Sequence, residues 1–283
     1  MNGAWGTYGS GSASPHLNSF TRTVAPLPAG TVVTLSTSGL TMLAASYPAS
    51  ALPSVSSVVS AADGSPAVAA GGLVSIYGKN KSALSMAAAA TPLGTGLDNA
   101  CIELNGSQIP LLYVSPGQIN AQLPFNAAGN TTLAIHSPGG ISQNYMFTVQ
   151  PTAPSVFMAG VAGPETGLAL IVRDDNGQLV TPTNPIHPND TLTIYLTGMG
   201  QTSPAIQAGQ PAPSSPLSYA NIAPVITLGS STLSIGYAGL APGEVGVYQI
   251  NATVPFNVPT GLAMPLTITQ GSGATTQNVR VVN

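Results

Sequence analysis

Charge is what this sequence has least of. Five of the 283 residues are Lys or Arg and eight are Asp or Glu, so charged residues make up 5% of the chain. An ordinary soluble domain carries about 25%. Five cations cannot line a groove that follows a phosphate backbone, so we expect no nucleic-acid partner. The formal net charge of −3 is too small to favour disorder, and a nearly neutral surface favours self-association.

Cysteine is nearly absent too. Cys101 is the single cysteine, which excludes an intrachain disulfide, a cysteine-rich zinc site and a covalently attached haem. We interpret Cys101 as a small buried hydrophobic residue, with an intermolecular disulfide as the alternative. No metal or cofactor is expected.

Long apolar runs are missing. The best window of about 20 residues, residues 153–172, is interrupted by Pro154, Pro164 and Glu165, so we expect no integral membrane segment. The start, Met1–Gly6, lacks the basic and apolar stretches of a signal peptide. Ser, Thr, Asn and Gly solubilise the chain in place of Lys and Glu, which is typical of exported proteins. We therefore expect an extracellular or cell-surface location, with the targeting segment removed or outside this sequence.

Helical patterns are rare, and residues 84–90 are the one stretch expected to form a helical turn or two. Elsewhere, short β-branched runs alternate with clusters of Gly, Pro, Asn and Ser, which predicts an all-β sandwich or barrel. Leu73–Tyr77 and Leu192–Leu196 are expected strands. Residues 170–180 are expected to form a hairpin, because Asn176-Gly177 supplies the positive φ of a tight turn.

An internal repeat is the strongest pattern. Gln118–Asn126 recurs as Gln249–Asn257 with seven of nine positions identical. Ser75–Tyr77 recurs as Thr193–Tyr195, in the same order along the chain. The repeat predicts two related immunoglobulin-like β-sandwich domains in tandem, at residues 55–150 and 151–283. One larger barrel-like arrangement of both repeats is the alternative.

Residues 1–54 precede the repeat and differ from it. Gly and Ser dominate residues 6–14, whereas an apolar set further on predicts an extended or β-hairpin segment. The set consists of Val32, Val33, Leu35, Leu40 and Leu43. Extended segments of this kind can add a strand to a neighbouring subunit. The five residues are therefore the candidate assembly contacts.

Three long strings resemble a known family. They are Gly71–Gly78, Pro110–Phe125 and Tyr237–Gly243, and they are similar to the Solibacter-type acidobacterial C-terminal domain, an uncharacterised family at the ends of large exported proteins. The resemblance covers residues 55–283. It implies an extracellular, β-rich, non-catalytic module and transfers no catalytic or binding residue.

Catalytic patterns are weak. His16, His136 and His187 stand in no motif with a nucleophile, and no nucleophile elbow occurs. The run Asp174–Gly177 lacks the spacing of a calcium loop, so it is interpreted as a turn capped by its own side chains. The chain is not expected to be an enzyme.

Aromatic residues are few, and most are expected to pack in the core. They are Tyr77, Tyr113, Tyr195, Tyr237 and Tyr248, with Phe125 and Phe256 filling equivalent core sites.

Two functional hypotheses follow. The first is a structural subunit of a surface filament or layer, a homopolymer joined head to tail through residues 1–54. The second is an adhesion or carbohydrate-binding module of a larger surface protein.

Overall fold

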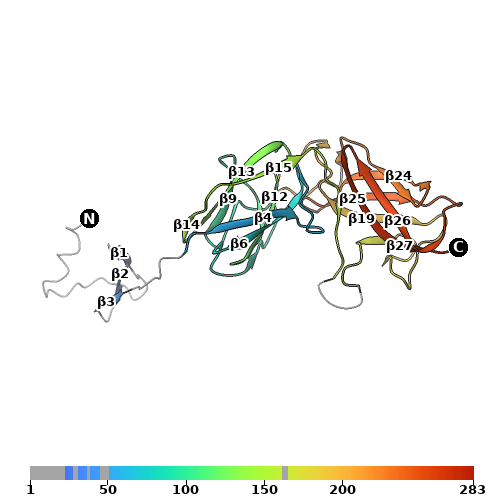
Figure 1. Ribbon diagram of the computed structural model, residues 1–283. Helices are drawn as coiled ribbons and strands as arrows, with labels where there is room; N and C mark the ends of the chain where they lie inside the picture. Colours follow the sequence, from blue (N-terminus) through green and yellow to red (C-terminus); the bar gives the residue numbers. More distant parts are fainter. Residues whose placement is uncertain (1–22, 28–30, 37–38, 45–50, 161–164) are drawn as a thin grey trace. The chain divides into compact units, whose positions relative to one another are not determined.

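The computed structural model describes residues 23–27, 31–36, 39–44, 51–160 and 165–283 (Figure 1). Strands and turns make up the described ranges, and no helix occurs in them. The chain divides into two compact units, Met1–Ser50 and Ala51–Asn283. The prediction of an all-β chain is therefore confirmed.

The first unit contains a three-stranded antiparallel sheet. Its strands are β1 (Thr23–Leu27), β2 (Thr31–Ser36) and β3 (Gly39–Ala44), in the order β1-β2-β3. The expected hairpin is the β2–β3 pair, and β1 adds a strand that the pattern did not predict.

The second unit begins with one β-sandwich, called here the first sandwich. One sheet has the order β4 (Ser54–Ser60), β6 (Leu73–Lys79), β12 (Gln118–Gln122), β11 (Leu111–Val114), β7 (Met86–Ala87). The other runs β10 (Ser107–Gln108), β9 (Ala100–Leu104), β13 (Gly129–Ser137), β15 (Tyr145–Gln150), β5 (Val68–Ala69), with β14 (Gly140–Ile141) on β13 and β8 (Gly96–Leu97) on β9. The helical turn expected at residues 84–90 is wrong, because Met86 and Ala87 form the edge strand β7, which pairs with β11.

The second sandwich follows directly. One sheet has the order β18 (Gln178–Leu179), β17 (Ile171–Arg173), β19 (Thr191–Thr197), β25 (Tyr248–Thr253), β24 (Ser234–Leu240), β21 (Tyr219–Ala220), β20 (Thr202–Ser203), with β16 (Ser155–Val156) on β19. The other runs β23 (Ser231–Thr232), β22 (Val225–Leu228), β26 (Gly261–Gln270), β27 (Gly273–Val281). The expected hairpin at residues 170–180 is the β17–β18 pair.

Both sandwiches have the strand order of an immunoglobulin domain. The sheets β4-β6-β12-β11 and β16-β19-β25-β24 follow the order A-B-E-D, and β9-β13-β15 and β22-β26-β27 follow C-F-G. The tandem of two immunoglobulin-like sandwiches is therefore confirmed, and the single-barrel alternative is wrong.

The repeated motif forms the central strand E of each sandwich. Its apolar residues, Ile119 and Ala121 in β12 and Ile250 and Ala252 in β25, are buried. Its amides lie on the other face, where the Gln118 side chain donates to Asn120 Oδ1 at 2.7 Å. The Gln249 side chain donates to Asn251 Oδ1, also at 2.7 Å. The repeat therefore encodes packing and a local amide pair.

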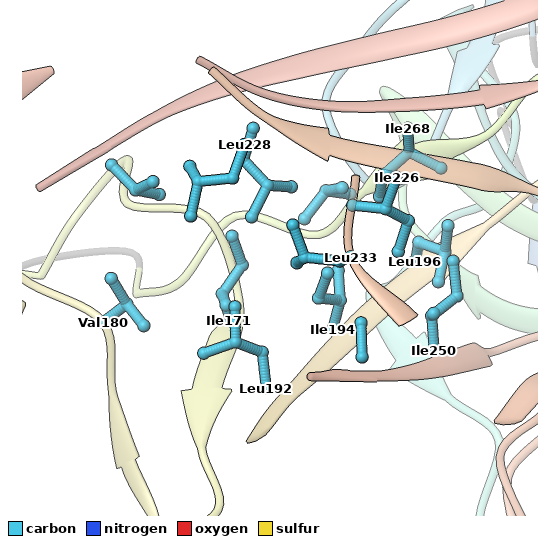
Figure 2. Packing of buried hydrophobic residues seen from close by; sticks show 14 of the residues in the cluster. Ile171, Val180, Leu192, Ile194, Leu196, Ile226, Leu228, Leu233, Ile250 and Ile268 are labelled. Atoms are coloured by element: carbon cyan, nitrogen blue, oxygen red, sulfur yellow. The ribbon is translucent and has the colours of Figure 1, made fainter. Parts of the chain in front are cut away.

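The core of each sandwich lies between its two sheets. In the second sandwich, Ile226 and Ile268 face Ile194, Leu196 and Ile250 from the opposite sheet (Figure 2). Alternate side chains on a strand point to opposite faces, which explains one wrong expectation. Ile76 takes the core face of β6, so the neighbouring Tyr77 is exposed; Tyr248, in contrast, is fully buried as expected.

Candidate functional site at the junction of the two sandwiches

The end of the first sandwich that meets the second is made of two loops. Gly71 N–H donates to Pro124 O at 3.3 Å, and Leu123 N–H donates to Gly72 O at 2.9 Å. Gly71 has a φ of +69°, and a Cβ there would collide with the ring of Phe125. Glycine at this position therefore lets the ring lie flat against the loop.

A buried amide joins the sandwiches. The Gln122 side chain donates to Gly71 O at 3.1 Å, and its carbonyl accepts from Gly209 N–H of the second sandwich at 2.6 Å. Gly209 O in turn accepts from Leu93 N–H of the first sandwich at 2.8 Å. Because buried amides are costly when unpaired, this bridge favours one fixed arrangement.

A threonine makes a second bridge. The Thr197 hydroxyl accepts from Leu73 N–H of the first sandwich at 2.9 Å and donates to Gly246 O at 2.8 Å. Ser65 and Ser155 add a hydroxyl pair at 3.2 Å. The bonds from Leu73 to Thr197 and between Ser65 and Ser155 each join the two sandwiches, so the junction is held at several points.

Phe125 packs against the core of the second sandwich. Its carbonyl accepts from the Gln201 side chain at 3.1 Å. The Tyr248 hydroxyl, beneath it, donates to Gly200 O. The expectation that Phe125 and Phe256 fill equivalent core sites is wrong, because Phe256 is 80% exposed.

A groove of about 280 Å³ lies beside this ring. It is lined by Phe125, Asn126, Gln201, Thr202, Ala205, Ile206 and Asn221. The lining combines an aromatic ring with amide and hydroxyl groups. This chemistry suits a neutral polyhydroxylated ligand, whose hydroxyls would bond the amides and whose C–H face would lie on the ring.

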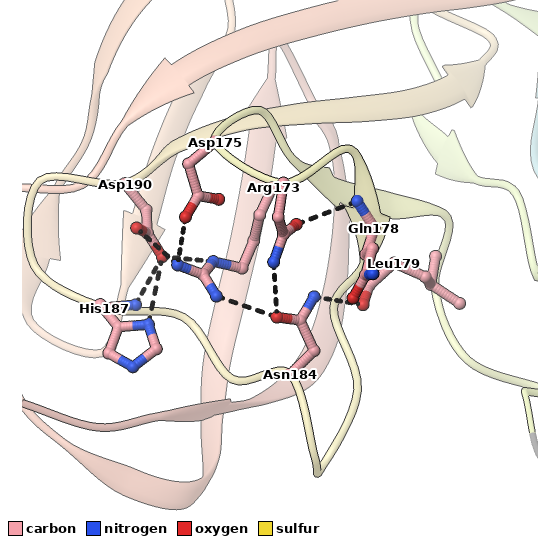
Figure 3. A network of polar contacts seen from close by, with 8 residues as sticks. Arg173, Asp175, Gln178, Leu179, Asn184, His187 and Asp190 are labelled. Atoms are coloured by element: carbon pink, nitrogen blue, oxygen red, sulfur yellow. Dashed lines mark hydrogen bonds and ion pairs between the residues drawn. The ribbon is translucent and has the colours of Figure 1, made fainter.

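A polar cluster lies near the opposite end of the second sandwich (Figure 3). The buried Arg173 guanidinium bonds both carboxylate oxygens of Asp190, at 2.8 and 3.1 Å. It also bonds Asp175 and Asn184, each at 2.9 Å, and Asp190 accepts from His187 N–H at 2.6 Å. The guanidinium thus pins three loop segments together, which is a structural role.

The predicted self-capped turn at Asp174–Gly177 is confirmed. Asn176 Oδ1 accepts from Gln178 N–H at 3.0 Å. Asp174 accepts from the Thr193 hydroxyl at 2.6 Å, and Asp175 pairs with Arg173. These side chains satisfy one another. No group of three or more His, Cys, Asp or Glu in the described ranges is arranged to hold a metal ion.

Three reactive side chains meet on the outer face of the β9–β13 pair. His136 Nε2 lies 3.0 Å from Glu103, and the register places His136 opposite Cys101. Cys101 is half-buried, not buried as expected. Burial and the Glu103 charge both raise the pKa of the thiol, which disfavours the nucleophilic thiolate. No local motif marks this group, because Cys101 and Glu103 lie on β9 whereas His136 lies on β13.

Lys81 is a buried cation in the first sandwich. Its ammonium donates to Gly117 O at 3.1 Å, and burial lowers its pKa to about 8. The repeat places Met199 at the equivalent position of the second sandwich, and Met199 is also fully buried. The aliphatic part of the Lys81 side chain thus takes the position in the first sandwich that Met199 takes in the second.

The predicted assembly residues lie on two strands of the first unit. Val32, Val33 and Leu35 are in β2, and Leu40 and Leu43 are in β3. β2 is paired on one edge by β1 and on the other by β3. Strand addition needs a free edge, which the central strand β2 lacks. The role of these residues in assembly stays a prediction.

His16 lies outside the described residues. No helix within the described ranges is long and apolar enough to cross a membrane.

Comparison with known proteins gives little beyond this geometry. No family model and no curated protein sequence matches the chain. Among solved structures, a surface glycan-binding protein from Prevotella bryantii is similar at 13% identity and a TM-score of 0.25, covering 81% of this chain and 42% of that one. Its counterpart from a xyloglucan utilization locus in Bacteroides uniformis has 12% identity and a TM-score of 0.25, covering 81% and 49%. The I9–I11 tandem of titin has 10% identity and a TM-score of 0.21, covering 94% and 83%.

The chain thus spans less than half the length of the two glycan-binding proteins. TM-scores this low carry no argument. The immunoglobulin-like assignment rests on the strand order of the two sandwiches.

Proposed function

We propose that this chain is a non-catalytic, extracellular structural protein, a subunit of a surface filament or layer in which the two sandwiches act as one stiff building block. The observation that carries the proposal is the junction, where Gln122, Thr197 and Phe125 bind the sandwiches through buried contacts. A stiff block transmits shape and force along an assembly, which a flexible tether between domains does not. The low charge and the resemblance to exported C-terminal domains support the extracellular location.

Negative-stain electron microscopy of the concentrated full chain tests this function. Regular filaments or sheets with a repeat near the length of one tandem are expected. Single two-lobed particles at every concentration would contradict the proposal.

Assembly through residues 1–54 belongs to the same proposal. β3 contains Leu40 and Leu43 and is an outer strand among the described strands of its sheet, so it is the part of the predicted set that can add to a neighbour's sheet. Replacing both leucines by aspartate should weaken assembly, measured by light scattering, if this edge is a contact. Unchanged scattering would remove the segment from the assembly.

A second candidate function is carbohydrate binding at the groove beside Phe125. The observation that favours it is the lining of one aromatic ring with the side chains of Asn126, Gln201 and Asn221. Glycan-array screening of the native chain should give binders that Asn126→Ala and Asn221→Ala lose. The exposed Asn144→Ala variant is the matched control. An array without binders, or binding unchanged by both groove variants, would exclude this site.

A further inference from the structure

Two large apolar side chains at one end of the second sandwich are almost fully exposed. Leu262 is 82% exposed and Phe256 is 80% exposed, more than any other large hydrophobic residue described. Phe256 lies in the segment that connects β25 to β26, and Leu262 is the second residue of β26. Each of these two side chains leaves exposed apolar surface near the start of β26.

This end repeats the junction end of the first sandwich. Asn189 N–H donates to Val254 O and Val254 N–H to Asp190 O, at 3.0 and 2.9 Å. The bond from Val254 to Asp190 matches the bond from Leu123 to Gly72, whereas the acceptor of Asn189 N–H lies one motif position before the equivalent of Pro124, the acceptor of Gly71 N–H. The backbone also matches, because Asn189 has a φ of +67° and Gly71 a φ of +69°.

Phe256 therefore occupies the place that Phe125 occupies at the junction. Phe125 packs on a neighbouring sandwich, whereas Phe256 is exposed. The difference between the two rings is the presence of a neighbour. What Phe256 lacks is a surface like the one that receives Phe125.

The repeat-equivalent of the end that receives Phe125 is the end of the first sandwich that lies opposite the junction (Figure 1). Asn80 with a φ of +56° stands where Gly198 has +79°, and the next residues, Lys81 and Met199, are both buried. The Asn80 side chain donates to Leu52 O at 3.2 Å and so fixes the segment that leads into β4. In the second sandwich, Ala153 N–H makes the matching attachment to Gly198 O at 2.8 Å.

Two large apolar side chains are exposed at this end of the first sandwich. Leu52 is 63% exposed and Leu84 is 62% exposed. Gly117 precedes the repeated motif where Tyr248 precedes it in the second sandwich, so the ring of Tyr248 has no counterpart there.

We propose that a second copy of this chain docks head to tail, with Phe256 and Leu262 of one copy packed on the Leu52 and Leu84 end of the next. The contact resembles the internal junction. Each of its two surfaces is equivalent, through the repeat, to one of the two surfaces that bind each other at the junction. It rests on the proposed structural function and supplies its longitudinal contact. When two copies join through opposite ends, the dimer still has one unoccupied Phe256 end and one unoccupied Leu84 end. The contact therefore extends into a fibre unless it closes into a ring.

Sedimentation velocity on the full chain tests this contact. The wild type should associate as its concentration rises, and Phe256→Asp and Leu84→Asp should each weaken the association by at least about tenfold, as truncation of an interface anchor does. Met146→Asp is the matched control. Met146 is 70% exposed but lies on the face of β15, away from both ends, so this variant should associate like the wild type.

Mixing the two variants sharpens the test. The Phe256→Asp copy keeps a good receiving end and the Leu84→Asp copy keeps a good donating end, so the mixture should form one-to-one dimers that do not grow. Circular dichroism checks that each variant is folded. Association that persists in Phe256→Asp, or a mixture that stays monomeric, overturns the proposed contact but leaves the structural function standing. A wild type that is monomeric at every concentration overturns both.

Discussion

At the scale of single residues, the junction depends most on the Gln122 side chain. Replacing Gln122 by leucine removes the bonds to Gly71 O and Gly209 N–H and leaves both groups buried without that partner. We expect a loss of about 1–3 kcal/mol in the free energy of unfolding, measured by urea denaturation. Gln143→Leu, at an exposed site, is the control and should change stability by less than about 0.5 kcal/mol. Equal losses in both variants would show that the bridge contributes nothing.

Lys81 gives a pH-dependent prediction. Its folded-state pKa is about 8, below the ordinary value of 10.5, so between these values the unfolded chain binds more protons than the folded chain. Stability therefore rises with pH across this window. Lys81→Met, which copies Met199, should remove this rise and stabilise the protein at pH 7 by about 1–3 kcal/mol.

Thermal unfolding of the wild type and Lys81→Met at several pH values measures both effects. The difference in Tm between the two should shrink as the pH increases from 8 to 10.5. A constant difference would show that the ammonium is not desolvated.

At the scale of elements, the β17–β18 hairpin and the loop before β19 depend on Arg173. Arg173→Ala leaves the buried Asp190 carboxylate without its bidentate partner. Removing one member of a buried ion pair costs about 3–5 kcal/mol.

Hydrogen exchange of Arg173→Ala should be faster at Ile171–Arg173 and at the start of β19 than in the first sandwich. Lys79→Ala is the control, because Lys79 is exposed and lies in the first sandwich. Uniform exchange across both sandwiches would contradict this local role.

The elements themselves could be predicted from the sequence, and their long-range contacts could not. Strands such as Leu73–Tyr77 follow from β-branched runs between turn residues, and the recurrence of Gln118–Asn126 predicted two related domains. The partners of Gln122, Gly71 and Gly209, lie far along the chain, where no local pattern points to them. Arg173 bonds Asp175, Asn184 and Asp190, which are nearer in sequence but stand in no common motif. Phe125 and Phe256 share one motif yet differ in burial, because burial here depends on a neighbouring sandwich.

At the scale of the whole molecule, the bonded junction implies that the two sandwiches unfold together. Phe125 is the test residue, since its ring rests on the core of the second sandwich. Phe125→Asp should cost about 2 kcal/mol, roughly half the loss for a fully buried phenylalanine, and should split one calorimetric transition of residues 51–283 into two. Phe256→Asp changes the same motif position at an exposed site.

Measured at a dilution where the chain is monomeric, Phe256→Asp should leave the single transition unchanged. Two transitions in Phe125→Asp alone would mean that the ring couples the sandwiches, so that the tandem behaves as one mechanical block. Two transitions already present in the wild type would mean that the buried bridges of Gln122 and Thr197 position the sandwiches without coupling their stability. In that case the stiffness required of a structural subunit would have to come from the assembly around it.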